Sequence, residues 1–193
     1  MVIIIPLHAQ KSINDTIIEP IAIDKTILSG VGIPKVKLKA HPERGYYQKR
    51  IYKGSELSVY ILSSETAVNK IDDFPIDEFV YYMNGRADIK TVNGDSISFN
   101  SGDYFFVPRG FKGHWTNNGG NTYNLELSVI SNKRADSTLV SKTKHPFLLN
   151  KDLISGIKLT QVNEKTYSDI IHSGVELEII TESENPGKTT IIN

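Results

Sequence analysis

The sequence has no cysteine and only five histidines in 193 residues. Without cysteine, disulfide bonds, zinc–thiolate sites and thiol chemistry are excluded within it. Basic residues are not in excess, because 22 Lys and Arg balance 22 Asp and Glu, whereas a nucleic-acid-binding surface carries a basic excess. No apolar run approaches the roughly 20 residues of a membrane-spanning helix. We therefore expect neither a nucleic-acid partner nor a membrane partner.

Helical periodicity is also scarce, since no window of ten or more residues follows the helical repeat. Short β-branched and aromatic runs between turn residues predict strands instead. Examples are Thr26–Gly32, Tyr46–Tyr52, Glu56–Leu62 and Thr122–Ile130; the last places Leu125, Leu127 and Val129 on one face and Glu126 and Ser128 on the other. The polar stretch Ser63–Asp73 is expected to form a loop over one end. The predicted fold class is all-β.

The chain is organised around the stretch from Phe74 to Trp115. An apolar and aromatic run ends at Gly85, and a further strand is expected at Tyr104–Val107. Between them, Asn93-Gly94 separates two alternating segments, which is a strong hairpin signal because both residues accept positive φ. Consecutive strands joined by tight turns predict an antiparallel barrel or sandwich.

Two spacings in this stretch resemble the signatures of the cupin superfamily. Glu78 is followed, after six residues, by Gly85, and Gly102 is followed, after five residues, by Pro108 and then by Gly110. The resemblance implies a cupin-type jelly-roll barrel. Because one fold hosts many functions, it implies the fold firmly and the function weakly.

Two shorter segments resemble one branch of the superfamily. Asp77-Glu78-Phe79 and the ending Gly110–Trp115 are similar to the ureidoglycine-aminohydrolase-like and ethanolamine-utilisation cupins. The resemblance covers roughly Val36–Ile130.

The metal ligands that this resemblance implies are largely missing. A metal-binding cupin uses two His and one Glu from the first signature and one His from the second, a set that suits Fe, Mn, Ni or Zn. The expected first positions, Ile71 to Phe74, contain no His, and the expected second position is Gly113. His114 lies one place late, which directs it to the opposite strand face. We therefore predict no metal and no other cofactor.

Three residues remain as candidates for ligand binding: Glu78, Tyr82 and Trp115. Glu78 either contacts a ligand or moves a proton inside the barrel, or it lies at the rim, where it pairs with a neighbour such as Arg86 or caps backbone donors. It is the one weak candidate for catalysis. Tyr82 shares a strand face with Glu78, and Trp115 shares one with Gly113. These two aromatic residues either line a pocket or fill a small barrel.

The C-terminal part repeats the front at a constant offset of 120 residues. The matching pairs are Tyr47 and Tyr167, Ile51 and Ile171, Gly54 and Gly174, Glu56 and Glu176, Leu57 and Leu177, and Val59 and Ile179. The alternative is coincidence between two hairpins of similar composition. A partial copy that contains only the first strands of the fold leaves strand edges unpaired, and these must be covered by the barrel or by another chain.

These observations divide the chain into an N-terminal segment (1–25), a cupin barrel (26–130), a linker (131–141) and a partial second cupin-like repeat (142–193). Residues 1–10 are either an ordinary edge strand or a truncated export signal. The location stays open: the cytoplasm is favoured, and export is expected if residues 1–10 are a truncated signal.

Three functions stay open. The first is binding of a small polar molecule in a barrel without the usual metal site. The second is a ureidoglycine-type cupin enzyme of nitrogen or carbon metabolism that uses Glu78 as acid or base. The third is a non-catalytic scaffold barrel. A homodimer is expected, because closed two-fold dimers are the commonest oligomers.

Overall fold

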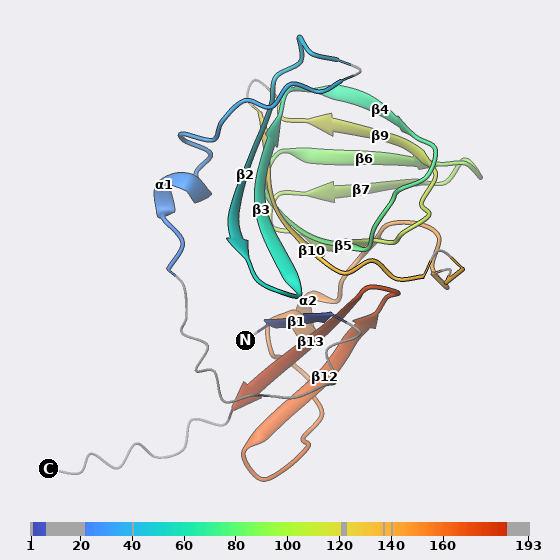
Figure 1. Cartoon of the computed structure of the whole chain (residues 1–193). Coiled ribbons are helices and arrows are strands. Elements are labelled where there is room, and N and C mark those ends of the chain that lie inside the picture. The colour runs from blue at the N-terminus through green and yellow to red at the C-terminus, as the bar shows by residue number, and fades with distance from the viewer. Residues whose placement is uncertain are drawn as a thin grey trace, which may run out of the picture.

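The computed structural model describes residues 2–6, 22–39, 41–120, 123–136, 138–139 and 141–184. These residues form three antiparallel sheets and two single-turn helices (Figure 1). The all-β prediction is confirmed. Among the described residues, neither helix has the length or the apolar character to cross a membrane.

Two of the sheets face each other and form the barrel. The six-stranded sheet contains, in spatial order, β11 (Phe147–Leu148), β8 (Tyr104–Val107), β5 (Glu78–Asn84), β10 (Asn124–Ser131), β3 (Leu57–Ser64) and β2 (Tyr46–Lys53). The four-stranded sheet contains β4 (Ala67–Ile71), β9 (Gly113–Asn118), β6 (Arg86–Thr91) and β7 (Ser96–Asn100). The chain crosses between the sheets repeatedly, as in a jelly roll. These strands lie in the predicted region 26–130 except β11, which comes from the part predicted as a second repeat, and the last residue of β10; the domain boundaries stay a prediction.

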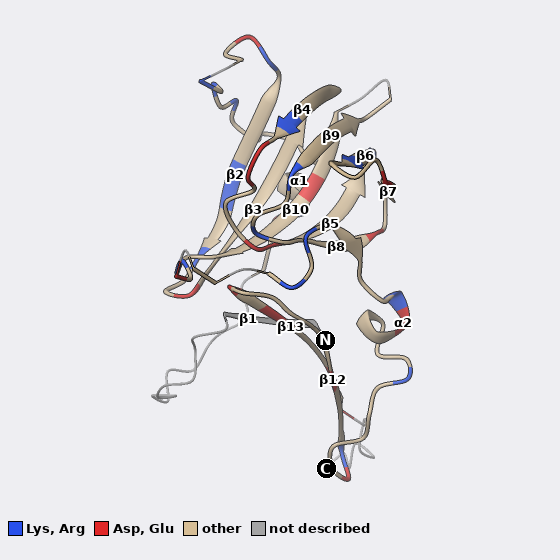
Figure 2. Cartoon of the chain, turned by 90° about the vertical axis from the view of Figure 1, so that its right-hand side faces the viewer, with Lys and Arg blue, Asp and Glu red and all other residues tan. Residues whose placement is uncertain are grey.

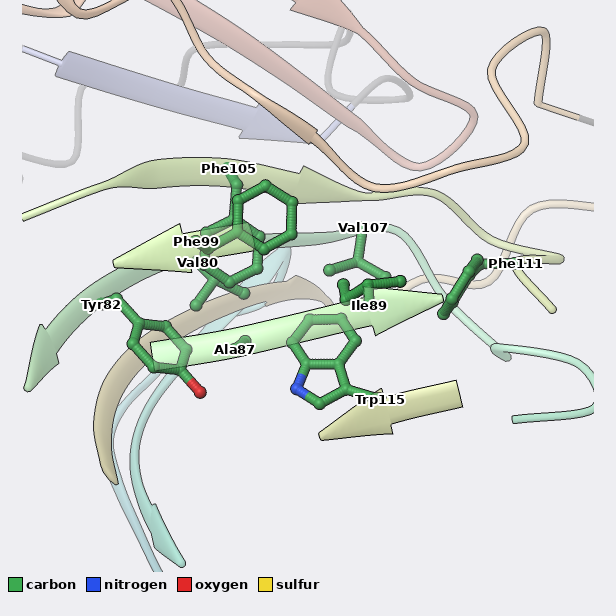
Figure 3. Close-up of a cluster of buried hydrophobic side chains, with 9 residues drawn as sticks. All are labelled: Val80, Tyr82, Ala87, Ile89, Phe99, Phe105, Val107, Phe111 and Trp115. Carbon is green, nitrogen blue, oxygen red and sulfur yellow. The ribbon is translucent and has the colours of Figure 1, made fainter. Parts of the chain in front are cut away.

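Aromatic side chains fill one half of the barrel interior. The cluster, drawn in Figure 3, consists of Val80, Tyr82, Ala87, Ile89, Phe99, Phe105, Val107, Phe111 and Trp115. Phe99 and Phe105 come from opposite sheets and stack with their ring centroids 4.1 Å apart. Both are fully buried, and truncating such a residue to Ala typically costs about 3–5 kcal/mol. The cluster joins the two sheets and leaves the other half of the interior open.

The predicted hairpin at Asn93-Gly94 is present between β6 and β7. Among the described residues Gly94 has a φ of 93°, whereas Asn93 is not in the positive-φ region. The Gly94 amide donates to the carbonyl of Thr91 at 3.0 Å, and the Thr91 amide donates to the carbonyl of Asp95 at 2.9 Å. Only one of the two positions therefore requires the conformation that glycine permits.

Two expectations for irregular regions are wrong. The predicted loop Ser63–Asp73 contains the edge strand β4, which pairs with β9. Its pattern is hard to recognise because the outward Val68 is 65% exposed while the polar Asn69 faces the interior. The predicted strand Thr26–Gly32 instead begins with the helical turn α1 (Lys25–Leu28). The carboxylate of Asp24 accepts a hydrogen bond from the Thr26 amide, and this N-cap outweighs the weak strand propensity.

The third sheet lies beneath the barrel (Figures 1 and 2) and has the order β1-β13-β12. Its strands are β1 (Val2–Pro6), β12 (Thr166–Ser173) and β13 (Leu177–Glu184). Leu177 and Ile179 are fully buried and pack against Phe79 and Phe106 on the outer face of the six-stranded sheet. The predicted partial repeat thus packs on the barrel of its own chain. Val2–Pro6 is a strand, and the export-signal alternative stays a prediction because residues 7–10 lie outside the described residues.

The β12–β13 hairpin reproduces the β2–β3 hairpin in detail. The two ladders have equivalent registers, each with an irregularity at the same step, and equivalent turn bonds of 2.8 Å. The paired positions are Tyr47 with Ser63 and Tyr167 with Ser183, and the turn bonds run from the Gly54 amide to Leu57 O and from the Gly174 amide to Leu177 O. Matching irregularities are what a duplication predicts, and the partial repeat stays a prediction.

The similarity extends further than the constant offset indicated. Helix α2 (Lys151–Ile154) is capped by Asn150 as α1 is capped by Asp24. Each helix is followed by Ser-Gly, with positive φ at Gly30 and Gly156. The loop that follows is six residues shorter in the second copy, which moves the helices out of the 120-residue register.

Candidate functional site

The open half of the barrel contains a cavity of about 390 Å³. Its walls come from β2, β3, β5 and β10 of one sheet and from β4 and β9 of the other. The lining residues are Tyr46, Gln48, Tyr60, Leu62, Asn69, Ile71, Phe74, Pro75, Ile76, Glu78, Val80, Trp115, Asn117, Glu126, Ser128 and Ile130. The set is amphipathic and contains no Lys, Arg or His.

Two carboxyl groups face this cavity, from Glu78 at the start of β5 and from Glu126 on β10. Both residues are half-buried, and no ion pair among the described residues involves either of them. Glu78 accepts a short hydrogen bond from the Ser128 hydroxyl. The proposed rim pair with Arg86 is wrong, because Arg86 pairs with Asp88 at 2.7 Å.

Burial perturbs the protonation of both groups. It raises the pKa of Glu78 to about 7, and the Ser128 hydrogen bond partly opposes this change. Burial also raises the pKa of Glu126 to about 8, and the negative charge of Glu78 adds to the effect. Neighbouring carboxyl groups titrate as a pair, since ionising one disfavours ionising the other. Near neutral pH the cavity therefore contains both protonated and ionised carboxyl groups, which donate and accept hydrogen bonds.

Tyr82 lies behind the cavity wall and does not line it. Its side chain is fully buried, its hydroxyl donates to Asn117 Oδ1 at 3.0 Å, and it accepts from Asn124 Nδ2 at 3.2 Å. Burial raises the pKa of Tyr82, so the hydroxyl stays protonated. Tyr82 thus holds the lining residue Asn117 in position.

Trp115 lines the cavity as the sequence analysis proposed. Its indole Nε1 donates to Asn117 Oδ1 at 2.6 Å. The polar end of the indole is therefore occupied, and the ring surface is what a ligand would meet. Whether Glu78, Tyr82 and Trp115 act in ligand binding stays a prediction.

Glu126 is the residue that sequence reasoning missed, together with Tyr46, Tyr60 and Asn69. The alternation along β10 separates the Glu126 face from the Leu127 face without showing which one is interior. We call the C-terminal residues 142–184 the tail. The apolar face of β10 is the outer one, because Leu127 and Val129 pack in the cluster between the six-stranded sheet and the tail. The sequence did offer one signal: a polar strand face such as that of Glu126 must contact water, either at the surface or in a cavity.

His114 on β9 is exposed, while its neighbours Gly113 and Trp115 are buried. The predicted slip to the opposite strand face is confirmed. Within the described residues, no group of three or more His, Cys, Asp and Glu is arranged to hold a metal ion. The absence of a metal site stays a prediction.

Two buried carboxylates, which accept hydrogen bonds from each other's backbone, join the tail to the loop that precedes Glu78. Asp77 accepts hydrogen bonds from the amides of Arg109, Val175 and Glu176, at 2.9 Å for Arg109 and 2.7 Å for Glu176. Glu176 in turn accepts from the amides of Asp77 at 3.2 Å and Ala135 at 3.1 Å. We call this arrangement, Asp77 with Glu176, the carboxylate clamp. It fixes the position of Glu78, the next residue in the chain.

The antiparallel barrel of two facing sheets agrees with the jelly-roll fold that the cupin resemblance implied. Residues 53–120 match the family model described as the EutQ-like cupin domain. The match covers part of the barrel, and over these residues the predicted resemblance to the EutQ-like cupin branch is confirmed.

Comparison with solved structures gives low overall similarity. The EutQ protein of Clostridium difficile has 19% identity and a TM-score of 0.44, with 54% of this chain and 82% of that chain covered. The ethanolamine utilization protein Q of Salmonella typhimurium LT2 has 16% identity and a TM-score of 0.41, with coverage of 51% and 77%. KdgF from Halomonas sp. has 18% identity and a TM-score of 0.38, with coverage of 47% and 82%. A comparison with curated proteins gives no match.

Proposed function

We propose that the barrel binds a small polar molecule, either uncharged or positively charged, between Glu78 and Glu126. The observation that carries the proposal is the pairing of two cavity-facing carboxyl groups with a lining that contains no basic side chain. Glu78 has the Ser128 hydroxyl as one partner, and each carboxyl group keeps further hydrogen-bonding capacity that a ligand or water in the cavity can satisfy.

The size of the cavity supports a small ligand. Its volume of about 390 Å³ lies near the lower end of the range for small-molecule sites, about 300–1,000 Å³. The surfaces of Tyr46, Tyr60 and Trp115 offer apolar contact, and Asn69 offers an amide group. The Asn117 amide is already bonded to Tyr82, Trp115 and Ser64. Such a mixture of aromatic faces with a few polar groups is typical of sites that orient one molecule.

The charge of the cavity decides between ligand classes. A carboxylate or phosphate would approach Glu78 and Glu126 without any lining cation to compensate, which is electrostatically unfavourable. A neutral amide or alcohol can accept hydrogen bonds from the protonated carboxyl groups. An amine can pair with the ionised ones, and aromatic ring faces add a favourable cation–π contribution.

The test is a calorimetric titration with size-matched amides, alcohols, amines and carboxylates. Glu126→Gln is the site variant, and Glu164→Gln, which alters an exposed glutamate of the tail, is the matched control. We expect saturable binding of a neutral or cationic series, weakened at least about tenfold, or 1.4 kcal/mol, by Glu126→Gln alone. Preferential binding of carboxylates, or no binding of any series, would contradict the proposal, and the second result would favour the scaffold function.

An enzyme that uses Glu78 as acid or base is the second candidate. It is favoured by the pKa of about 7 at Glu78, since a general acid or base works best when its pKa lies near the operating pH. A ligand found in the titration would be incubated with the wild-type protein and with Glu78→Gln. Turnover that Glu78→Gln abolishes while affinity is retained would establish catalysis; binding without product in the wild type would exclude it for that ligand.

A further inference from the structure

A second pocket, of about 650 Å³, lies outside the barrel. It is formed by the turn between β6 and β7, by the segment 109–112 after β8, by Asp73, and by residue 139 with residues 141–145. Four basic residues line it: Arg109, Lys112, Lys144 and His145. Asp73 is the only acidic residue in the lining. This polarity is opposite to that of the barrel cavity, in a chain whose total charge is zero.

Several hydrogen-bond donors around this pocket have no partner among the described residues. Arg109 uses Nη1 alone, which donates to the carbonyls of Ala135 at 3.0 Å and Asp136 at 3.4 Å and lies 3.5 Å from Glu176 Oε1. No ion pair involves Lys112 or Lys144 within the described part of the chain.

His145 adds a second, independent indication of a ligand. Its Nδ1 is buried and has no hydrogen-bond partner. Native structures satisfy nearly all buried polar atoms, with ordered water or ions where protein groups are absent. His145 lines the same pocket as two lysines without ion pairs, and its Nδ1, when it carries the proton, is a donor for which the described residues supply no acceptor.

We propose that this pocket binds an oxyanion of the phosphate type, either free or as a small ester. A phosphate group offers several strong acceptors to the Lys112 and Lys144 ammonium groups and to the free nitrogens of Arg109. The hydroxyl of Ser141, a buried residue in the lining, is a further donor. Val92 and Leu139 line the same pocket and are 68% and 48% exposed, so they can cover the apolar part of an ester.

A merely solvated basic surface is the competing explanation, and a neighbouring residue serves as its control. Lys90 lines an adjacent depression that also includes Lys112, but it does not line this pocket. General attraction between phosphate and surface charge would weaken equally when Lys90 or Lys112 is removed. A built site would lose affinity only with the residues that line it.

The experiment is a calorimetric titration of the full chain with inorganic phosphate and, separately, with glycerol phosphate, at constant ionic strength set with chloride. We expect saturable binding of at least one of them, weakened about tenfold or more by the double variant Lys112→Ala/Lys144→Ala and unchanged by Lys90→Ala. The anion with the higher affinity identifies the source of the phosphate group. Ser141→Ala should weaken binding about threefold without changing the melting temperature.

Two results would overturn the proposal. One is the absence of saturable binding of both anions to the wild-type chain. The other is a loss of affinity in Lys90→Ala equal to that in the single variant Lys112→Ala, which would show non-specific attraction. The replaced lysines are exposed, so their loss should not unfold the protein, and melting curves should confirm that every variant is folded.

Discussion

Replacing Glu126 by Gln should stabilise the protein in alkaline solution and leave its stability nearly unchanged in acid. In the folded state the pKa of Glu126 is raised from 4.5 to about 8. Its contribution to stability is therefore fully present below about pH 4.5 and is lost as the pH rises through about 8, because the unfolded chain ionises first. Glutamine has nearly the same shape and cannot ionise, so the variant does not lose stability in this range.

The magnitude follows from the difference in pKa. One pH unit of difference corresponds to about 1.4 kcal/mol, which sets an upper limit of about 5 kcal/mol once the group is fully ionised. The residue is half-buried and faces a cavity that water can enter, so solvent screening reduces the effect. We expect a gain of about 2 kcal/mol, equivalent to about 4–8 °C in Tm for a protein of this size.

The assay compares thermal unfolding of wild type, Glu126→Gln and the exposed control Glu164→Gln at about pH 5 and about pH 8.5, on either side of most of the titration range. The control should show no difference at either pH. An unchanged or lower Tm for Glu126→Gln at the higher pH would refute the reasoning. It would show that the ionised carboxylate is satisfied in the folded state by a cation or by hydrogen bonds.

Four further predictions concern stability and assembly. Gly94→Val should lower the free energy of unfolding by about 1–3 kcal/mol in a urea titration, because a β-branched residue is strained at a φ of 93°. Gly174→Val should loosen the tail and increase its proteolysis, because an added Cβ would lie 2.4 Å from Asp77 Oδ2; an intact tail would contradict the role of the clamp. Burial lowers the pKa of His172, so its neutral form is the stable one and stability should fall as the pH drops below about 6.5; His172→Leu should reduce this acid loss in melting curves. Deleting residues 141–193 should expose the apolar outer face of the barrel and change solubility or the mass in light scattering. A soluble product with unchanged Tm and oligomeric state would argue against a role of the tail in packing on the barrel and in the expected homodimer.

The barrel was predictable because its signals are local. The spacing from Glu78 to Gly85 and the Asn93-Gly94 turn each set backbone geometry within a few residues, and the structure agrees with both at the level of the fold. Strand β4 was not predictable in this way. An edge strand whose outward residue is Val68 and whose inward residue is Asn69 reverses the usual pattern of polarity.

The candidate site was only half predictable, for a related reason. A strand pattern separates two faces but does not say which one is interior when both are covered. On β10 the apolar face, with Leu127 and Val129, is covered from outside by Leu177 and Ile179 of the tail. That contact joins segments far apart in the sequence, and it leaves the polar face, with Glu126, to line the cavity.

The carboxylate clamp couples the docking of the tail to events in the barrel cavity. The Asp77 side chain holds the tail, and the adjoining Glu78 faces the cavity that we propose binds a ligand. Thermodynamic linkage is reciprocal: a ligand that restrains Glu78 must also favour the docked tail to the extent that the two residues move together. The amides of Val175 and Glu176, about a hundred residues away in the sequence, should then exchange with deuterium more slowly when the cavity is occupied. Hydrogen exchange at the tail would thus detect a ligand that never touches it.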